Sequence, residues 1–229
     1  MFIGLIIISV VFGGIGALVS RRLRSKFAQY SQMPLSKGLN GAEVAKAMLQ
    51  HYSIHDVQIV EGRGMLTDHY NPQKKLISLS PDVYHGRTVA AAAVAAHECG
   101  HAVQHAESYA ALKFRSAMVP LVNISSSMQQ YLFMGAMFMG AAGNSSWLLI
   151  GAIAIYGITA LFSTVTLPVE FDASNRALAW LDSSGFARGS EYDGAKDALW
   201  WAAMTYTVGA IAAIAQLLWL VFIFMGSRD

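Results

Sequence analysis

The chain has 229 residues, of which 55% are hydrophobic and only 13% are charged, and its mean hydropathy is +0.42. Soluble domains carry about 25% charged residues, so this composition indicates that a lipid bilayer is part of the fold. The formal net charge of +2 is too small to favour nucleic acid as a partner. A single cysteine, Cys99, excludes an intrachain disulfide.

Four segments are apolar and long enough to cross a hydrocarbon core, which takes roughly 20 helical residues. They are residues 1–20, 118–140, 147–167 and 201–225. The first has no positive charge before its apolar run, which favours a retained anchor over a cleaved signal peptide. The second is polar in its first half, so it either packs inside a bundle or begins as a helix in the membrane interface. The predicted fold is therefore membrane α-helical, with about four transmembrane helices.

Basic residues near the ends of these segments predict the orientation in the membrane. They cluster in the RRLRSK run, near residues 113–115 and between residues 168 and 200, whereas residues 141–146 contain none. By the positive-inside rule, residues 21–117 and 168–200 face the cytoplasm and both termini lie outside. We therefore expect a multi-pass protein of the cell membrane.

The cytoplasmic region, residues 21–117, is predicted to be α+β. A helix is expected to begin at Asn40, and short β-rich runs follow it, interrupted by the turn signal Asn71-Pro72. These runs predict a hairpin or small sheet. Thr88 is then the expected N-cap of a second, alanine-rich helix over residues 88–106.

This second helix contains His97-Glu98-Cys99-Gly100-His101, an H-E-x-x-H motif. Histidines four residues apart share one helix face and can bind one Zn²⁺, which lowers the pKa of a bound water. Glu98 is then the candidate general base. The alternative is a pair of satisfied core histidines, but it leaves the acidic residue of a buried helix unexplained. The motif predicts a zinc-dependent hydrolase with one Zn²⁺ per chain.

A catalytic zinc needs a third protein ligand, and Glu170 in TLPVEFDASNRALAWL is the strongest candidate. Pro168 is expected to end a membrane helix and start the next one, which would put Glu170 in a first helical turn on the cytoplasmic side. Asp172 would point to another face of that helix, as a rival ligand or a supporting group. The alternative is that both acids simply favour a helix N-terminus.

Five segments, in this order, resemble those of the bacterial membrane zinc metallopeptidases of the YugP type, which are relatives of the gluzincins. They are GLNGAEVA, LTDHYNP, LSPDVY, AAHECGHAVQH and LPVEFDASNRA, and they extend over most of the chain. The resemblance implies a gluzincin-like zinc peptidase region in which His97, His101 and Glu170 hold the metal and Glu98 is the general base. In gluzincins an aspartate four residues after the glutamate ligand supports the first histidine. Here that position is Ser174, so Asp172 or Asn175 is expected to take the role.

His69 and Tyr70, in LTDHYNP, are candidates for a catalytic role, as donors to the oxyanion or the substrate. The alternative is that Asp68, His69 and Asn71 only build a turn. Arg176 is expected to pair with an acid near the metal or to serve as a positive-inside charge.

Together these features predict a membrane-embedded metalloendopeptidase that hydrolyses peptide bonds near the cytoplasmic membrane face. Its partners would be the bilayer and a peptide or membrane-protein substrate, which could add to an edge strand of the small sheet. Two alternatives remain open. One is an intramembrane protease of the site-2 type, with Asp182 as third ligand, and the other is a zinc-holding membrane scaffold with no proteolytic role.

Overall fold

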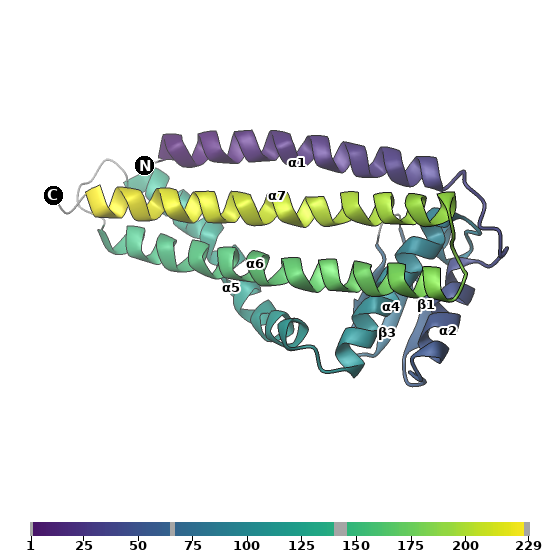
Figure 1. The fold of residues 1–229 in the computed structure, drawn as a ribbon. Coiled ribbons are helices and arrows are strands. Elements are labelled where there is room, and N and C mark those ends of the chain that lie inside the picture. The colour runs from purple at the N-terminus through teal and green to yellow at the C-terminus, as the bar shows by residue number, and fades with distance from the viewer. Residues whose placement is uncertain (1, 65–66, 140–145, 227–229) are drawn as a thin grey trace. The chain divides into compact units, whose positions relative to one another are not determined.

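The computed structural model describes residues 2–64, 67–139 and 146–226, and Figure 1 shows the arrangement of their elements. Within these residues the chain forms seven helices and one small sheet. The helices are α1 (Phe2–Tyr30), α2 (Gly41–His51), α3 (Pro81–Tyr84), α4 (Val89–Ala106), α5 (Ala110–Met139), α6 (Ser146–Ser183) and α7 (Ser190–Gly226). The strands are β1 (Gln58–Glu61), β2 (His69–Asn71) and β3 (Leu76–Leu79).

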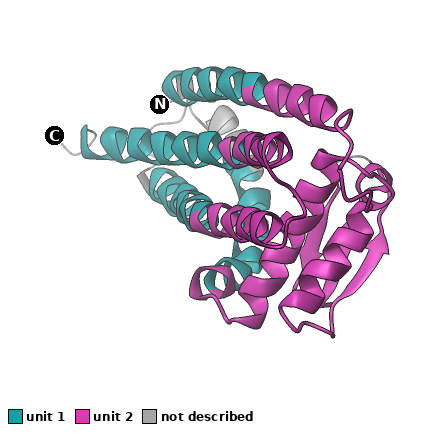
Figure 2. Ribbon diagram, turned by 45° about the vertical axis from the view of Figure 1, so that its right-hand side comes forward, with its two compact units in different colours: residues 1–18, 114–167, 205–229 teal, residues 19–113, 168–204 magenta. Residues whose placement is uncertain are grey.

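The chain divides into two compact units, coloured separately in Figure 2. Unit 1 comprises residues 1–18, 114–167 and 205–229, and unit 2 comprises residues 19–113 and 168–204. Helices α1, α5, α6 and α7 each contribute to both units.

Three of the described helices are long and apolar enough to cross a membrane: α1, α6 and α7. They correspond to the first, third and fourth predicted segments. The second predicted segment, residues 118–140, lies mostly in α5, and its last residue falls outside the described residues together with most of the 141–146 loop. A fourth transmembrane helix therefore stays a prediction.

Helix α6 runs without interruption through Pro168. The expectation that Pro168 ends one helix and starts another is wrong, and Glu170 lies in a helix interior rather than in a first turn. Proline removes one backbone hydrogen bond, but tertiary contacts directly after it hold the chain in helical form. The side chain of Gln104 donates a hydrogen bond to the Val169 carbonyl at 2.8 Å, and Ala173 packs against Gly100 of α4. Tertiary packing thus overrides the local signal.

The three strands form a sheet in the order β1-β3-β2. Strands β2 and β3 make the predicted hairpin, with His69 opposite Ser78 and Asn71 opposite Leu76, whereas β1 pairs with β3 in parallel. The Asn71 side chain accepts hydrogen bonds from the backbone N–H groups of Gln73 and Lys74, which closes the turn. Strand β2 is therefore an edge strand, and it packs against α4.

Helix α4 forms the centre of the unit 2 core, as its alanine-rich sequence predicts. Almost every residue from Val89 to Ala96 is buried, and α2 packs against the helix through Val44, Met48 and Leu49. Small side chains allow neighbouring elements to approach α4 closely on several sides. The predicted N-cap is confirmed, because the Thr88 hydroxyl accepts a hydrogen bond from the backbone N–H of Ala91.

Helix α2 begins with a reciprocal capping box at Asn40, the residue predicted to open it. The Asn40 side chain accepts from the backbone N–H of Glu43, and the Glu43 carboxylate accepts from the backbone N–H of Asn40, both at 2.8 Å. This cap fixes the helix that supports one side of α4.

Replacing Asn40 by alanine is expected to destabilise unit 2 by about 1 kcal/mol, because one orphan N–H of α2 loses its acceptor. The measurement is the unfolding free energy of the detergent-solubilised protein. Asn40→Ser keeps an acceptor at the same position and is the matched control. Equal stability of the alanine and serine variants would contradict the prediction.

Candidate metal centre

Helices α4 and α6 bring together the three residues predicted as zinc ligands. His97 and His101 lie one turn apart on α4, and Glu170 faces them from α6. The Glu170 carboxylate oxygen Oε2 lies 3.4 Å from His97 Nε2 and 3.7 Å from His101 Nε2. The candidate ligand atoms of all three side chains lie within 4.8 Å of one another. All three residues belong to unit 2.

This arrangement fits a tetrahedral Zn²⁺. Bonds of about 2.0–2.1 Å from one ion place neighbouring ligand atoms roughly 3.4 Å apart, close to the separations found here. The Glu170 side chain is only 3% exposed, so its charge needs a nearby positive partner. Burial lowers the pKa of His101, but the interaction with Glu170, together with smaller contributions from Glu98 and Gln104, raises it, and the net shift is upward. The site therefore favours positive charge between the three side chains.

Glu98 and Cys99, between the two histidines, are both buried. Glu98 is 7% exposed, and it takes no part in the ion pairs that join His97 and His101 to Glu170. Cys99 is fully buried and faces α2, where its thiol donates to the Ala45 carbonyl at 3.5 Å. Burial raises the pKa of this thiol well above its usual value. Cys99 thus behaves as a small buried hydrophobic residue.

The second nitrogen of His97 contacts Ser174, one turn after Glu170 on α6. His97 Nδ1 lies 3.1 Å from Ser174 Oγ. The position at which gluzincins carry an aspartate thus keeps its contact with the first histidine, now through a hydroxyl. The expectation that Asp172 or Asn175 replaces it is wrong, because Asn175 is exposed and Asp172 contacts a different side chain.

The second nitrogen of His101 contacts Gln104, a residue that sequence reasoning missed. His101 Nδ1 lies 3.0 Å from Gln104 Oε1. Gln104 Nε2 donates to the Val169 carbonyl and to Asp172 Oδ2, each at 2.8 Å. Asp172 also accepts from Arg176 Nε at 2.6 Å, so Arg176 does pair with an acid near the candidate metal site. The sequence feature that could have indicated the His101–Gln104 contact is a glutamine three residues after His101, on the same side of a buried helix.

The two candidate donors from LTDHYNP have different surroundings. His69 is exposed, and its Nδ1 lies 2.8 Å from the Thr67 carbonyl. Tyr70 is partly buried, and its hydroxyl shares a 2.7 Å hydrogen bond with His105 Nδ1 of α4. Burial and, to a smaller extent, the charge of Asp56 raise the pKa of Tyr70 to about 12, so its hydroxyl stays protonated near neutral pH.

Asp68, the residue before this pair, has a structural role. Its carboxylate accepts hydrogen bonds from the backbone N–H and the hydroxyl of Ser80, which precedes α3. Asn71 thus builds the turn after β2, whereas Asp68 joins the residue before β2 to the start of α3.

Comparison with known proteins identifies the family. The family model described as "Putative neutral zinc metallopeptidase" matches residues 5–225. The chain belongs to this family. A curated relative, "Putative membrane protease YugP" of Bacillus subtilis (strain 168), is 39% identical over 225 residues, which cover 98% of each chain. No solved structure matches. The resemblance found in the sequence motifs is therefore confirmed, and this zinc metallopeptidase family includes a relative named as a membrane protease.

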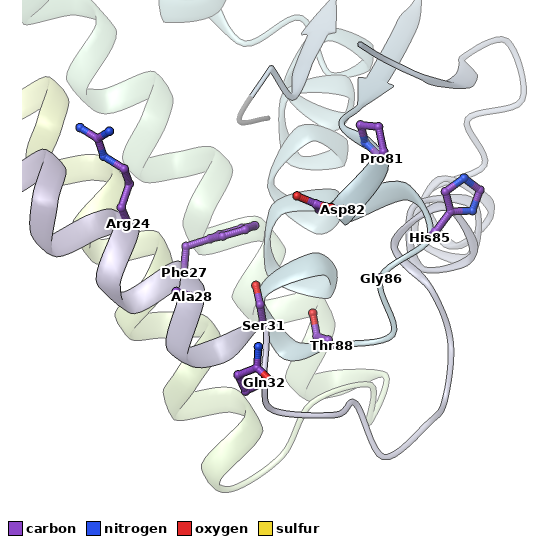
Figure 3. Close-up of a pocket in the computed structure, with 10 residues that line it drawn as sticks. All are labelled: Arg24, Phe27, Ala28, Ser31, Gln32, Pro81, Asp82, His85, Gly86 and Thr88. Carbon is purple, nitrogen blue, oxygen red and sulfur yellow. The ribbon is translucent and has the colours of Figure 1, made fainter. Parts of the chain in front are cut away.

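Unit 2 also contains a surface pocket of about 630 Å³ that is separate from the ligand group (Figure 3). Arg24, Phe27 and Ala28 of α1 line one side of it, and Asp82 and His85 lie on the other. None of the candidate zinc ligands lines this pocket, and its walls are mainly apolar. The candidate metal centre therefore lies outside this pocket.

Gly100 permits the close approach of the two helices that carry the ligands. A Cβ atom at Gly100 would lie 2.5 Å from the Ala173 carbonyl oxygen and 3.0 Å from its Cα, both backbone atoms of α6. Real Cβ atoms do not come this close to backbone, so any side chain here would push α6 away. Glu170 lies one turn before Ala173 and would move with it.

Gly100→Ala is expected to destabilise the protein by about 1–3 kcal/mol through overpacking, and to weaken zinc binding because Glu170 retreats. Thermal unfolding and zinc content per chain measure the two effects. Gly209→Ala in α7 is the matched control, because a Cβ there meets nothing within 4 Å. The control should keep its stability or gain up to about 1 kcal/mol from helix propensity. Normal zinc content in Gly100→Ala would show that the helix spacing does not set the ligand geometry.

Proposed function

We propose that this protein is a zinc-dependent endopeptidase of the cell membrane, with His97, His101 and Glu170 as metal ligands and Glu98 as general base. The observation that carries the proposal is the convergence of the three ligand side chains from two different helices: His101 and Glu170 are buried, His97 is partly buried, and their ligand atoms lie within 4.8 Å of one another. Membership of a zinc metallopeptidase family supports the same chemistry.

When bound, zinc would act as a Lewis acid that activates water and polarises the scissile carbonyl. The chain supplies the other functions. The Nε2 atoms of His97 and His101 and the Glu170 carboxylate hold the metal and leave a coordination position for a non-protein ligand. Glu98 accepts the proton lost by the attacking water and passes it to the leaving amine nitrogen.

Substrate is proposed to bind as an extended strand along β2. This strand lies at the edge of the sheet and packs against α4, the helix that carries the motif. Main-chain hydrogen bonds to an edge strand require little of the substrate sequence, which suits an endopeptidase. Tyr70 on β2 is then a candidate donor to the substrate or the oxyanion, and His69 is the second candidate.

The orientation in the membrane supports substrates near the cytoplasmic face. Residues 21–117 and 168–200, which carry the ligands and the general base, are assigned to the cytoplasm by their basic residues. Glu170 follows the predicted span 147–167 within one turn of the same continuous helix. Membrane proteins, or segments held close to the bilayer, are therefore the proposed substrates.

The site-2-type alternative is disfavoured by the position of Asp182. This residue is exposed and follows Glu170 by twelve residues on α6, which corresponds to about 18 Å along a helix axis. An ion at His97 and His101 is within reach of Glu170 and too far from Asp182. The scaffold alternative has the same three zinc ligands. It differs only in that Glu98 does not act as a general base.

Three variants test the proposal through zinc content and cleavage of an unfolded test protein. Glu98→Gln should keep its zinc and lose cleavage, because the amide cannot accept the proton. Glu170→Ala should lose both, because two histidines alone hold zinc weakly. Asp182→Ala is the matched control on the same helix and should behave like wild type.

Other outcomes identify the alternatives. Loss of zinc in Asp182→Ala with retention in Glu170→Ala would favour the site-2-type site. Zinc-loaded wild type that cleaves neither unfolded protein nor membrane segments would favour the scaffold.

Tyr70→Phe is expected to lower kcat by about 100-fold with zinc content unchanged, as for the loss of one oxyanion donor. His69→Ala should have a smaller effect, because His69 is exposed and already contacts the Thr67 carbonyl. Steady-state kinetics on a peptide substrate separate the two. Tyr131→Phe, at an exposed position of α5, controls for the loss of a hydroxyl as such. An unchanged kcat in Tyr70→Phe would remove Tyr70 from the proposed site.

A further inference from the structure

Gln104 is a buried polar residue, and both the oxygen and the NH₂ group of its side-chain amide form hydrogen bonds. It has no exposed surface, and it lies on α4 three residues after His101. Its Oε1 faces His101 Nδ1, and its Nε2 faces the Val169 carbonyl and the Asp172 carboxylate of α6. A fully buried amide with this set of partners has only one satisfactory orientation.

The orientation follows from the partners on α6. A carbonyl oxygen and an ionised carboxylate only accept hydrogen bonds, so the atom that faces them must be the NH₂ group. The amide oxygen is therefore the atom that faces His101. Because this oxygen can only accept, His101 Nδ1 must carry the hydrogen, and in the neutral imidazole the lone pair is then on Nε2, the atom beside Glu170.

The carboxylate that fixes this orientation is itself held in place. Arg176 Nε donates to Asp172 Oδ2 at 2.6 Å, across one turn of α6, and Arg176 also pairs with Glu107 directly after α4, at 2.6 Å. This charge-assisted hydrogen bond fixes the Asp172 carboxylate, and the carboxylate in turn keeps the Gln104 amide from turning over.

We propose that Gln104 is a positioning residue that holds His101 in the Nδ1–H form, with its Nε2 lone pair directed at the metal site, and that Asp172 sets the direction of the Gln104 amide. This inference rests on the proposed zinc site. His97 differs, because its partner Ser174 is a hydroxyl that donates or accepts with equal ease and does not select a tautomer. The site thus has one histidine fixed in advance and one that adjusts when metal binds.

The test uses the full-length protein in detergent with two readouts. The first is zinc affinity, measured by competition with a chelator. The second is the ¹⁵N shift of the His101 ring nitrogens in zinc-free protein, at a pH where the imidazole is neutral. Gln104→Met has a similar volume and no acceptor oxygen. We expect it to bind zinc about 10–100-fold more weakly and to lose the Nδ1–H preference.

Two variants at Asp172 test the second step. Gln104 Nε2 and Arg176 Nε both donate to the same atom, Asp172 Oδ2, so the amide oxygen of Asp172→Asn can accept both hydrogen bonds. We expect this variant to keep the Nδ1–H form and to bind zinc within a few-fold of wild type. Asp172→Leu lacks the acceptor, and we expect it to bind zinc more weakly and to lose part of the Nδ1–H preference. Gln50→Met, at an exposed position on α2, is the matched control.

Three results would overturn the inference. One is wild-type affinity and tautomer in Gln104→Met, and another is an Nε2–H form of His101 in wild type. The third is a folded Asp172→Leu variant with wild-type affinity and tautomer. If Gln104→Met does not fold, the Asp172 variants and the wild-type tautomer still decide. Failure of wild type to bind zinc would instead refute the proposed function, and the ¹⁵N shifts would still test the role of Gln104.

Discussion

The candidate metal centre depends on the close contact between α4 and α6 at Gly100 and Ala173. The two histidines are fixed by spacing within one helix, but the third ligand comes from a segment more than sixty residues away in the chain. Its position is determined by how closely the second helix approaches the first. Gly100 lies within the motif itself, where a hydrogen in place of a side chain lets the α6 backbone come into contact. The packing distance between α4 and α6 therefore determines the geometry of the three candidate ligands.

Charge is the second constraint on this part of the fold. Glu170 and Glu98 are both buried carboxylic acids beside two imidazoles, and buried carboxylates are costly without a positive partner. A divalent cation meets this requirement for the side chains that face it. Asp172 lies outside this group, and its charge is met by Arg176, which also pairs with Glu107. The acids near the centre thus fall into two sets, one whose charge the proposed metal would neutralise and one that the protein neutralises by itself.

Much of the fold and of the candidate metal centre was predictable from sequence, because the signals depend on residues close together in the chain. The spacing of His97 and His101, the caps at Asn40 and Thr88, and the hairpin around Asn71-Pro72 each depend on residues a few positions apart. The prediction that Pro168 breaks a helix was also local, and it was wrong because contacts with α4 hold the helix together. The partners of the two histidines could not be read from sequence. Ser174 and Gln104 acquire their roles only when α4 and α6 meet.

The continuity of α6 also bears on where the proposed peptidase acts. A helix broken at Pro168 would have allowed Glu170 to move independently of the apolar segment before it. In an unbroken helix, Glu170 lies about 5 Å along the axis from residue 167, the predicted end of the span, at 1.5 Å per residue. Helix α4 is not among the three described helices apolar enough to cross a membrane. One ligand therefore comes from a helix that contains a candidate span, and the other two come from a helix that does not. This combination supports the proposed location of the site near the membrane face.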